Sequence, residues 1–193
     1  MRKAFGLFVV VGLLAIGAPA LAHEAHVHGV AHMNVTVEGK EVEIEWETPL
    51  ANLLSFEHAP ETEAQKEEVR TMAAGLRKAD SLFILPAEAR CRLKSVSLES
   101  EVLDDALLSP AGSRRAEKAH AKERAPDGKK HTEGHADLDM EVSFVCDNPE
   151  KLNSLRVDVF RAFPNLHELE VQMVTPRGQS AAELTPEADT LRW

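Results

Sequence analysis

Residues 27–48 alternate polar and apolar side chains on both sides of a short turn that contains a glycine. Before Glu38-Gly39-Lys40 the apolar positions are Ala31, Met33, Val35 and Val37, and after it they are Val42, Ile44 and Trp46. Side chains of successive strand residues point to opposite faces, so this pattern predicts a β-hairpin with one face toward a core. Pro49 ends the second strand, because proline cannot donate to a sheet ladder. A chain that opens this way is built around antiparallel sheet.

The rest of the chain adds further strands and a few helices. Apolar periodicity and capping residues predict helices at 62–78 and 147–163, and alternation predicts strands at 93–98, 136–146, 166–176 and 179–184. Regular strand–helix–strand alternation, which a parallel α/β fold requires, is missing. The predicted fold class is therefore α+β, with antiparallel β-sheets and a few packed helices.

The first 22 residues have the three parts of a secretory signal peptide. Arg2 and Lys3 form a basic start, residues 4–18 are apolar, and Ala20 and Ala22 supply the small residues that a signal peptidase reads. The apolar stretch is short for a membrane span, which needs about 17–25 residues. We therefore expect cleavage after Ala22 and a mature chain of residues 23–193 in a Gram-negative periplasm, without stable membrane insertion.

A polar, charged segment at residues 105–135 divides the mature chain. It contains proline, glycine, many charges and almost no large apolar residue, which is typical of a solvated loop or linker. We expect a first α+β half at 23–104 and a second at 136–193, in one compact unit. Both halves begin a strand after a histidine, which suggests a weak internal duplication.

The two cysteines, Cys91 and Cys146, lie far apart without a CxxC spacing. In an oxidising compartment a single structural disulfide is the preferred interpretation, and a metal–thiolate pair or a redox couple is the alternative.

Charge and motif content exclude several classes of function. Asp and Glu number 32 against 22 Lys and Arg, for a net charge of -10, which disfavours nucleic acid and anionic membrane surfaces as partners. The HExxH, GxSxG and phosphate-binding glycine motifs are missing from the sequence. We predict that the protein is not an enzyme. A zinc hydrolase is the alternative, because an open three-ligand zinc site is the catalytic type.

Nine histidines in a chain with two cysteines are the strongest functional feature. Seven lie in two clusters, at 23–32 and 120–135. On an extended strand His26, His28 and His32 share one face, and Val27, Met33 and Val35 point to the core. Imidazole suits Zn²⁺, Cu²⁺ and Ni²⁺, so the sequence predicts an exchangeable metal site. The candidate ligands are His26, His28, His32, His58, His131, His135 and Asp137. His120 and His167 are interpreted as ordinary polar residues.

Four blocks of residues together resemble a known family. They are His26-x-His28-Gly29-Val30-Ala31, Phe56-Glu57-His58-Ala59-Pro60, His135-Ala136-Asp137, and the ending from Val171 to Leu184. These blocks are similar to the ZrgA-like family of zinc-regulated periplasmic proteins, over nearly all of the mature chain. The resemblance implies zinc binding, cooperation with a high-affinity zinc ABC importer through its substrate-binding protein, and no chemistry on a substrate. It also implies a His-rich insertion at 105–135, although here that segment holds few histidines and much Lys and Arg.

Two other functions are open at this point. Signal cleavage would leave His23 as the new N-terminus, where its amine and imidazole could chelate one Cu²⁺. A structural or interaction protein with incidental histidines is the second alternative.

Overall fold

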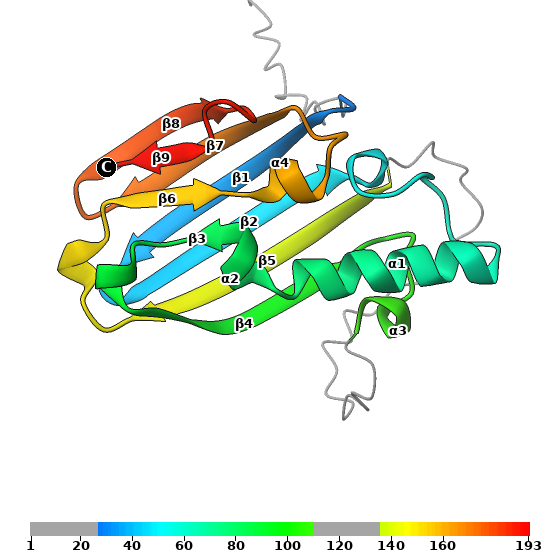
Figure 1. Cartoon of the computed structure of the whole chain (residues 1–193), viewed down its shortest axis with the longest axis horizontal. Helices are drawn as coiled ribbons and strands as arrows, with labels where there is room; N and C mark the ends of the chain where they lie inside the picture. The colour runs from blue at the N-terminus through cyan, green and yellow to red at the C-terminus, as the bar shows by residue number, and fades with distance from the viewer. Residues whose placement is uncertain (1–26, 110–135) are drawn as a thin grey trace, which may run out of the picture.

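A six-stranded sheet is the centre of the computed structural model, which describes residues 27–109 and 136–193. Its strand order is β4-β5-β2-β1-β7-β8 (Figure 1). Strands of both predicted halves pair with one another in this sheet. The bounds are β1 Val30–Glu38, β2 Glu41–Pro49, β4 Cys91–Glu99, β5 Asp137–Cys146, β7 Glu168–Thr175 and β8 Gly178–Leu184.

The predicted hairpin is confirmed as β1 and β2. Their antiparallel register pairs Glu38 with Glu41, and Gly39 adopts the positive φ of 56° that the tight turn requires. The strands predicted around 136–146, 166–176 and 179–184 are confirmed as β5, β7 and β8. All pairings in the large sheet are antiparallel except that of β1 with β7, which is parallel. The α+β class is confirmed.

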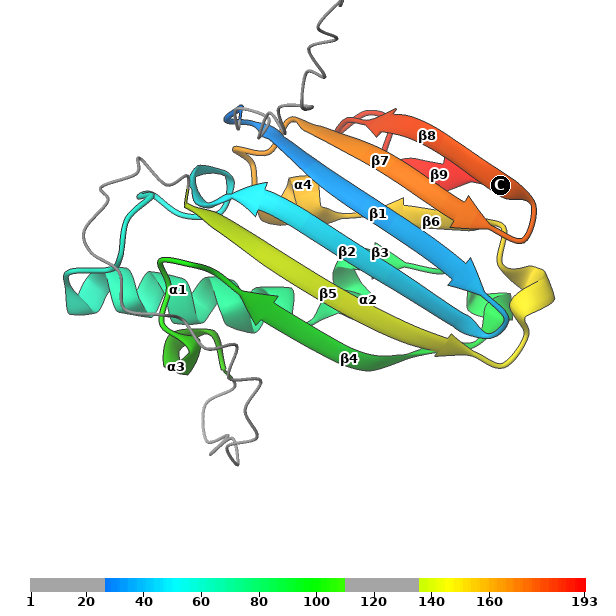
Figure 2. The same cartoon turned by 180° about the vertical axis from the view of Figure 1, so that it is seen from behind.

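A second layer covers one face of the large sheet. It consists of a small sheet, β3-β6-β9, and three helices on the same side, while none of the described elements covers the opposite face (Figures 1 and 2). We call that opposite face the open face. The bounds are β3 Phe83–Ile84, β6 Ser154–Val157, β9 Thr190–Arg192, α1 Glu63–Leu76, α2 Ala79–Leu82 and α4 Val159–Ala162. Short 3₁₀ turns lie at Leu50–Asn52, Ala87–Ala89 and Pro149–Lys151.

The core lies between these two layers. Trp46 of β2 is 1% exposed and packs edge-on against Phe83 and tilted against Phe163. The predicted helix at 62–78 is confirmed as α1, which Thr62 caps in a capping box with Gln65. Its apolar stripe of Val69, Met72, Ala73 and Leu76 is buried against the sheet layer.

The predicted helix at 147–163 is wrong. The chain there forms a 3₁₀ turn, then β6, then the short α4. Leu155 and Val157 of β6 are buried while Arg156 is exposed, so the local period is two. The strand pairs with β3 on one side and β9 on the other. Hydrogen bonds to these two distant strands outweigh the weak helical periodicity of the segment.

The predicted loop at 105–135 begins with helix rather than with loop. Residues Asp105–Leu108 form α3, and Asp104 caps it by accepting a hydrogen bond from the Ala106 N–H. Leu108 is buried, and its carbonyl accepts hydrogen bonds from the Arg77 guanidinium. Residues 110–135 lie outside the described part of the chain, as does the predicted signal peptide. Within the described ranges, no helix is long and apolar enough to cross a bilayer.

The disulfide between Cys91 and Cys146 is confirmed. The two residues are directly opposite each other at one end of the β4–β5 pair, with their Cα atoms 3.9 Å apart. Both cysteines of the chain are used in this bond. Bonded cysteines offer no thiolate to a metal, so the alternative of a metal–thiolate pair is wrong, while that of a redox couple stays a prediction.

Candidate metal-binding surface

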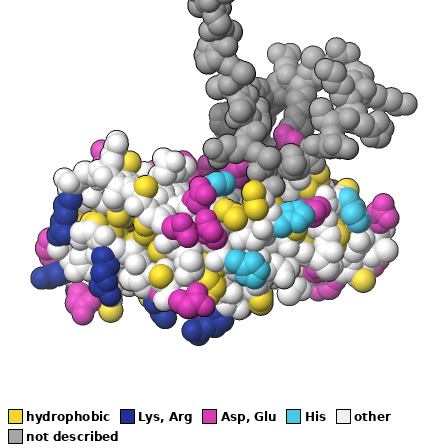
Figure 3. Space-filling model, turned by 90° about the horizontal axis from the view of Figure 1, so that it is seen from above, with side chains coloured by type: hydrophobic (Ala, Val, Ile, Leu, Met, Phe, Trp, Pro, Cys, Tyr) yellow, Lys and Arg dark blue, Asp and Glu magenta, His cyan; other side chains and the backbone are white. Residues whose placement is uncertain are grey.

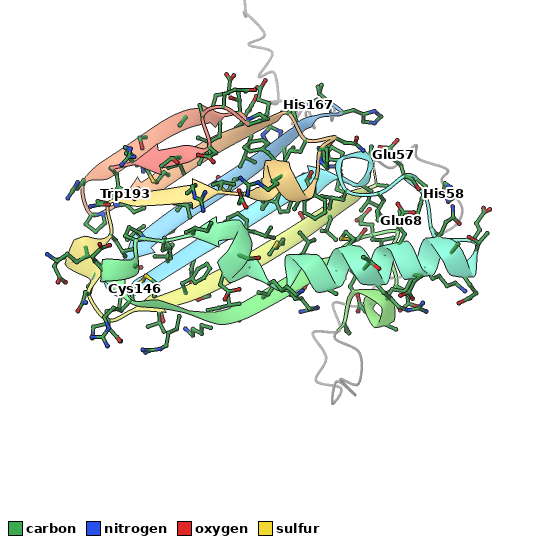
Figure 4. All side chains as sticks on the ribbon, in the orientation of Figure 1. Glu57, His58, Glu68, Cys146, His167 and Trp193 are labelled. Atoms are coloured by element: carbon green, nitrogen blue, oxygen red, sulfur yellow. A yellow bond between two sulfur atoms is a disulfide. The ribbon has the colours of Figure 1, made fainter. Side chains whose placement is uncertain are left out.

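Four histidines lie in the described part of the chain: His28, His32, His58 and His167. Histidine side chains gather with carboxylates on the face that Figure 3 shows. Figure 4 places Glu57, His58 and His167 at the end of the molecule where β1 begins. Of the other predicted ligands, His26, His131 and His135 lie outside the described residues, as does His23. The geometry below therefore concerns the described histidines and the carboxylates next to them.

His28 lies in a turn before β1, not on the strand. The Val30 N–H donates to the Val27 carbonyl at 3.1 Å, and Gly29 has a φ of 88°, which breaks the extended backbone. The prediction that His28 and His32 share one strand face is therefore wrong. Val27 was expected to point to the core but is 61% exposed for the same reason. Met33 and Val35 do point to the core, and His32 is exposed on the open face.

Asn52 holds this turn in place. Its side-chain oxygen accepts a hydrogen bond from the Gly29 N–H at 2.7 Å, and its amide nitrogen donates to the Val30 carbonyl at 2.9 Å and to the Thr48 hydroxyl at 3.1 Å. Asn52 is only 2% exposed, so it satisfies a backbone donor and a backbone acceptor that water does not reach. The position of His28 therefore depends on a buried amide.

Gly29 also joins the turn to the segment that leads into β7. Its carbonyl accepts hydrogen bonds from the N–H groups of His167 at 2.7 Å and Glu168 at 2.9 Å. A Cβ atom on residue 29 would lie 3.0 Å from Cδ2 of His167, so the ring packs against the glycine backbone. This contact makes His28 and His167 neighbours. The sequence interpretation treated His167 as an ordinary polar residue and did not predict this contact.

The loop after β2 brings a carboxylate to His28. Nε2 of His28 lies 2.9 Å from a carboxylate oxygen of Glu57, with the side chains 67% and 43% exposed. Glu68 of α1 anchors the loop by accepting hydrogen bonds from the N–H and the hydroxyl of Ser55. This contact between α1 and the loop fixes where Glu57 and its neighbour His58 project.

One ring nitrogen of His58 contacts a backbone carbonyl. Nδ1 lies 2.9 Å from the Ala59 carbonyl oxygen. The centre of the imidazole ring lies 5.3 Å from the centre of the Phe56 ring. Since a carbonyl only accepts, Nδ1 is the donor in this contact. A backbone carbonyl on the second nitrogen is the usual support for a metal-binding imidazole. His58 therefore stays a candidate ligand through Nε2, the nitrogen that this contact does not use.

His32 pairs with a carboxylate on the open face. Its Nδ1 lies 3.4 Å from a carboxylate oxygen of Glu170 on β7. The register continues this row to Glu183 on β8, opposite Glu170, and to Glu47 on β2, opposite His32. A shallow hollow of about 400 Å³ lies over the row and is lined by His32, Glu170 and Glu183 among others.

Carboxylates gather further along the open face. Partial burial raises the pKa of Asp139 above its ordinary value, and the negative charges of Glu47, Asp137, Glu99 and Glu101 raise it further. Asp137, a predicted ligand, lies at the start of β5 and is one of the carboxylates whose charge raises the pKa of Asp139. The open face therefore carries a negative potential beside His32.

Replacing Asp139 by asparagine should raise stability at pH 7. The folded state raises the pKa of Asp139, so this group destabilises the fold above that pKa and ceases to do so as pH falls through it. Partial solvent screening limits the gain to less than about 1 kcal/mol. Urea unfolding of the wild type and Asp139→Asn at pH 7 and pH 4 should show the difference shrinking at the lower pH. Glu187→Gln, in an exposed turn, is the control, and an equal gain there would contradict the prediction.

No three His, Cys, Asp or Glu side chains within residues 27–109 and 136–193 converge closely enough to hold a metal ion. What these residues provide is two histidine–carboxylate pairs, His28 with Glu57 and His32 with Glu170. Imidazole nitrogen and carboxylate oxygen are both ligands of zinc, so the donor set fits that ion. An ion at either pair would need water or further side chains to complete its coordination.

The sequence interpretation did not identify Glu57, Glu170 or Asn52. Glu57 precedes His58 in one of the blocks that resemble the family, but nothing in the sequence indicated its contact with His28. Glu170 is one of several alternating acidic residues and only the register with β1 distinguishes it. Nothing in the local pattern around Asn52 indicates a buried amide.

The comparisons with known proteins concern nearly the whole chain. No curated protein matched the chain. Residues 25–193 match the family described as ZrgA family zinc uptake protein. This match covers most of the 193 residues, including the turn of His28, the strand of His32 and the loop of Glu57. The chain therefore belongs to the ZrgA family of zinc uptake proteins.

Proposed function

We propose that this protein binds Zn²⁺ in the periplasm through exposed histidines and passes the ion to the substrate-binding protein of a high-affinity zinc ABC importer. The observation that carries the metal-binding part is the presence of two histidine–carboxylate pairs, one just before β1 and one on it. The proposed role involves no chemistry on a bound substrate.

Exposed pairs suit capture and release better than permanent retention. A closed structural zinc site has four protein ligands, frequently thiolates, and both cysteines of this chain are in a disulfide. His28 and His32 are both exposed, so an ion held there keeps contact with water and can exchange. His58 offers a third imidazole, and His26, His131, His135 and Asp137 are the further candidates that the sequence supplies.

The acidic character of the protein supports cation capture. The net charge is -10, and β2 presents Glu41, Glu43, Glu45 and Glu47 on the open face. A surface of one sign raises the local concentration of the opposite ion, although salt screens this attraction beyond about 8 Å. The carboxylates therefore favour the approach of Zn²⁺ to His32, and the imidazoles provide the stronger ligands.

The double variant His28→Ala/His32→Ala should bind Zn²⁺ at least about 10-fold more weakly than the wild type, because each pair loses its nitrogen ligand. Isothermal titration calorimetry of the mature chain at pH 7.5, purified without a histidine tag, measures this change. Affinity should also fall as pH is lowered, because imidazole must be neutral to bind a metal.

His167→Ala is the matched control, since it removes an exposed histidine from the same end of the molecule but has no carboxylate partner in the ion pairs described above. Its affinity should stay within about 2-fold of the wild type, well inside the 10-fold loss expected for a ligand. An unchanged affinity and stoichiometry in the double variant would contradict the assignment of His28 and His32 as zinc ligands.

Delivery to the importer rests on family membership. Zinc-loaded protein mixed with the metal-free substrate-binding protein should transfer its ion faster than zinc held by a small chelator of equal affinity. Equal transfer rates from the protein and from the chelator would contradict direct delivery and would indicate that the protein only buffers zinc.

A further inference from the structure

The two edges of the six-stranded sheet are built differently. β4 forms one edge and carries devices that prevent pairing with another strand. Its register with β5 shifts between Leu93 and Ser95, and its exposed Arg92 and Lys94 form ion pairs with Asp147 and Glu41. The bulge and the long charged side chains together hinder pairing of this edge with a strand from another chain.

β8 forms the other edge and lacks these devices. Its register with β7 is continuous from Leu184 opposite Leu169 to Gly178 opposite Thr175. The strand GQSAAEL contains no lysine, arginine or proline, and every residue from 178 to 183 is exposed. In the described part of the chain, no strand pairs with its outer side. Alternate N–H and C=O groups of β8 therefore point outward without a strand partner among the described residues.

We propose that β8 pairs with β8 of a second copy of this chain, antiparallel, about a twofold axis at Ala181. The two large sheets would then join into one continuous sheet, by strand addition at a free edge. This inference is independent of the zinc-binding function.

The sequence of β8 is self-complementary in that register. Ala181 lies opposite Ala181 of the other copy, Ser180 opposite Ala182, and Gln179 opposite Glu183. No like charges face each other, which would destabilise a cross-strand pair. Arg177 precedes the strand and Glu183 lies near its end, so antiparallel pairing also brings each arginine near the glutamate of the other copy. A parallel arrangement would place the two glutamates side by side.

Small side chains at the centre remove the steric obstacle to close approach. Ala181 and Ala182 are exposed on opposite faces of the strand, so neither face presents a bulky side chain at the axis. Ala181, Ala182 and Glu183 also line the hollow beside His32 and Glu170. A second copy at this edge would extend the floor of that hollow.

Ala181→Lys tests the interface by charge. It would place two ammonium groups directly opposite each other at the axis, so the dimer should weaken at least about 10-fold by the cost of like-charge pairs and edge lysines. Ser95→Lys, an equally exposed change on the β4 edge, is the matched control and should leave the dimer intact. Sedimentation velocity of the mature chain over a concentration series, with EDTA present, gives the dissociation constant without any contribution from zinc.

Cysteine substitutions test the register. In Ala181→Cys the two Cα atoms would lie about 4.5–5.5 Å apart, within disulfide range, so mild oxidation should give a covalent dimer. Gln179→Cys alone should not cross-link, because its two copies are offset by four residues, about 13 Å along the strand. A mixture of Gln179→Cys and Glu183→Cys should cross-link.

A wild-type chain that stays monomeric at every concentration and shows no cross-link in Ala181→Cys would overturn the proposal. Equal cross-linking of all single variants would also overturn it, because that pattern indicates random collision. Circular dichroism of each variant checks that the fold is retained.

Discussion

Replacing Asn52 by alanine should lower the free energy of unfolding by about 3 kcal/mol, because a buried hydrogen-bonding group left without a partner costs about 1–3 kcal/mol. The Asn52 amide pairs with the Gly29 N–H, the Val30 carbonyl and the Thr48 hydroxyl, and it is almost fully buried. Alanine leaves the Gly29 donor unsatisfied and adds a small cavity. The turn that positions His28 loses its anchor, so Zn²⁺ affinity should fall as well.

Urea unfolding followed by tryptophan fluorescence measures the stability change, and calorimetry measures the affinity. Asn34→Ala is the control, because Asn34 is exposed on the open face and its side-chain amide donates a long hydrogen bond of 3.4 Å to Glu45. It should change stability by less than about 0.5 kcal/mol. A loss below 1 kcal/mol in Asn52→Ala would contradict the role of the buried amide. Lost stability with unchanged zinc affinity would show that the turn does not position a ligand.

Removing the disulfide should cost about 4 kcal/mol of unfolding free energy. Cys91 and Cys146 close a loop with a sequence separation of 55, and cross-linking a loop of that length restricts the unfolded chain by roughly this amount. The bond also ties edge strand β4 to β5 where the pair begins, and Cys146 is fully buried. The double variant Cys91→Ala/Cys146→Ala removes the bond without leaving a free thiol.

Urea denaturation of the oxidised wild type, the reduced wild type and the double variant measures this contribution. The reduced wild type and the double variant should unfold at similar, lower urea concentrations. Reductant added to the double variant is the control and should have no effect. Equal midpoints for the oxidised and reduced wild type would contradict a structural role for the bond.

Strands with a clear local alternation were predictable from the sequence. The alternating side chains and Gly39 were enough to predict the β1–β2 hairpin. Strand patterns on both sides of Pro176-Arg177-Gly178 were enough to predict β7 and β8. Segment 147–163 was not predictable in the same way. Its apolar residues satisfy a helical period as well as a strand period, and the choice depends on pairing of β6 with β3 and β9.

The candidate site was predictable in its residue types but not in its geometry. The histidine clusters indicate a metal, and His32 lies on the exposed face as its strand pattern predicts. His28 departs from that pattern because Gly29 has a positive φ, which the surrounding hydrogen bonds of Asn52 and His167 stabilise. These contacts come from distant segments, so no local pattern contains them.

The sequence by itself determined the α+β class and the hairpin, because side-chain alternation is a local property, and it predicted imidazole as the metal ligand from local residue chemistry. Only the tertiary structure decided which carboxylates meet which histidines. The Glu170 contact with His32 depends on the parallel pairing of β1 with β7, and the Glu57 contact with His28 depends on the loop that Glu68 anchors. Sheet order is set by burial of the whole core, and it joins residues that lie far apart in the chain.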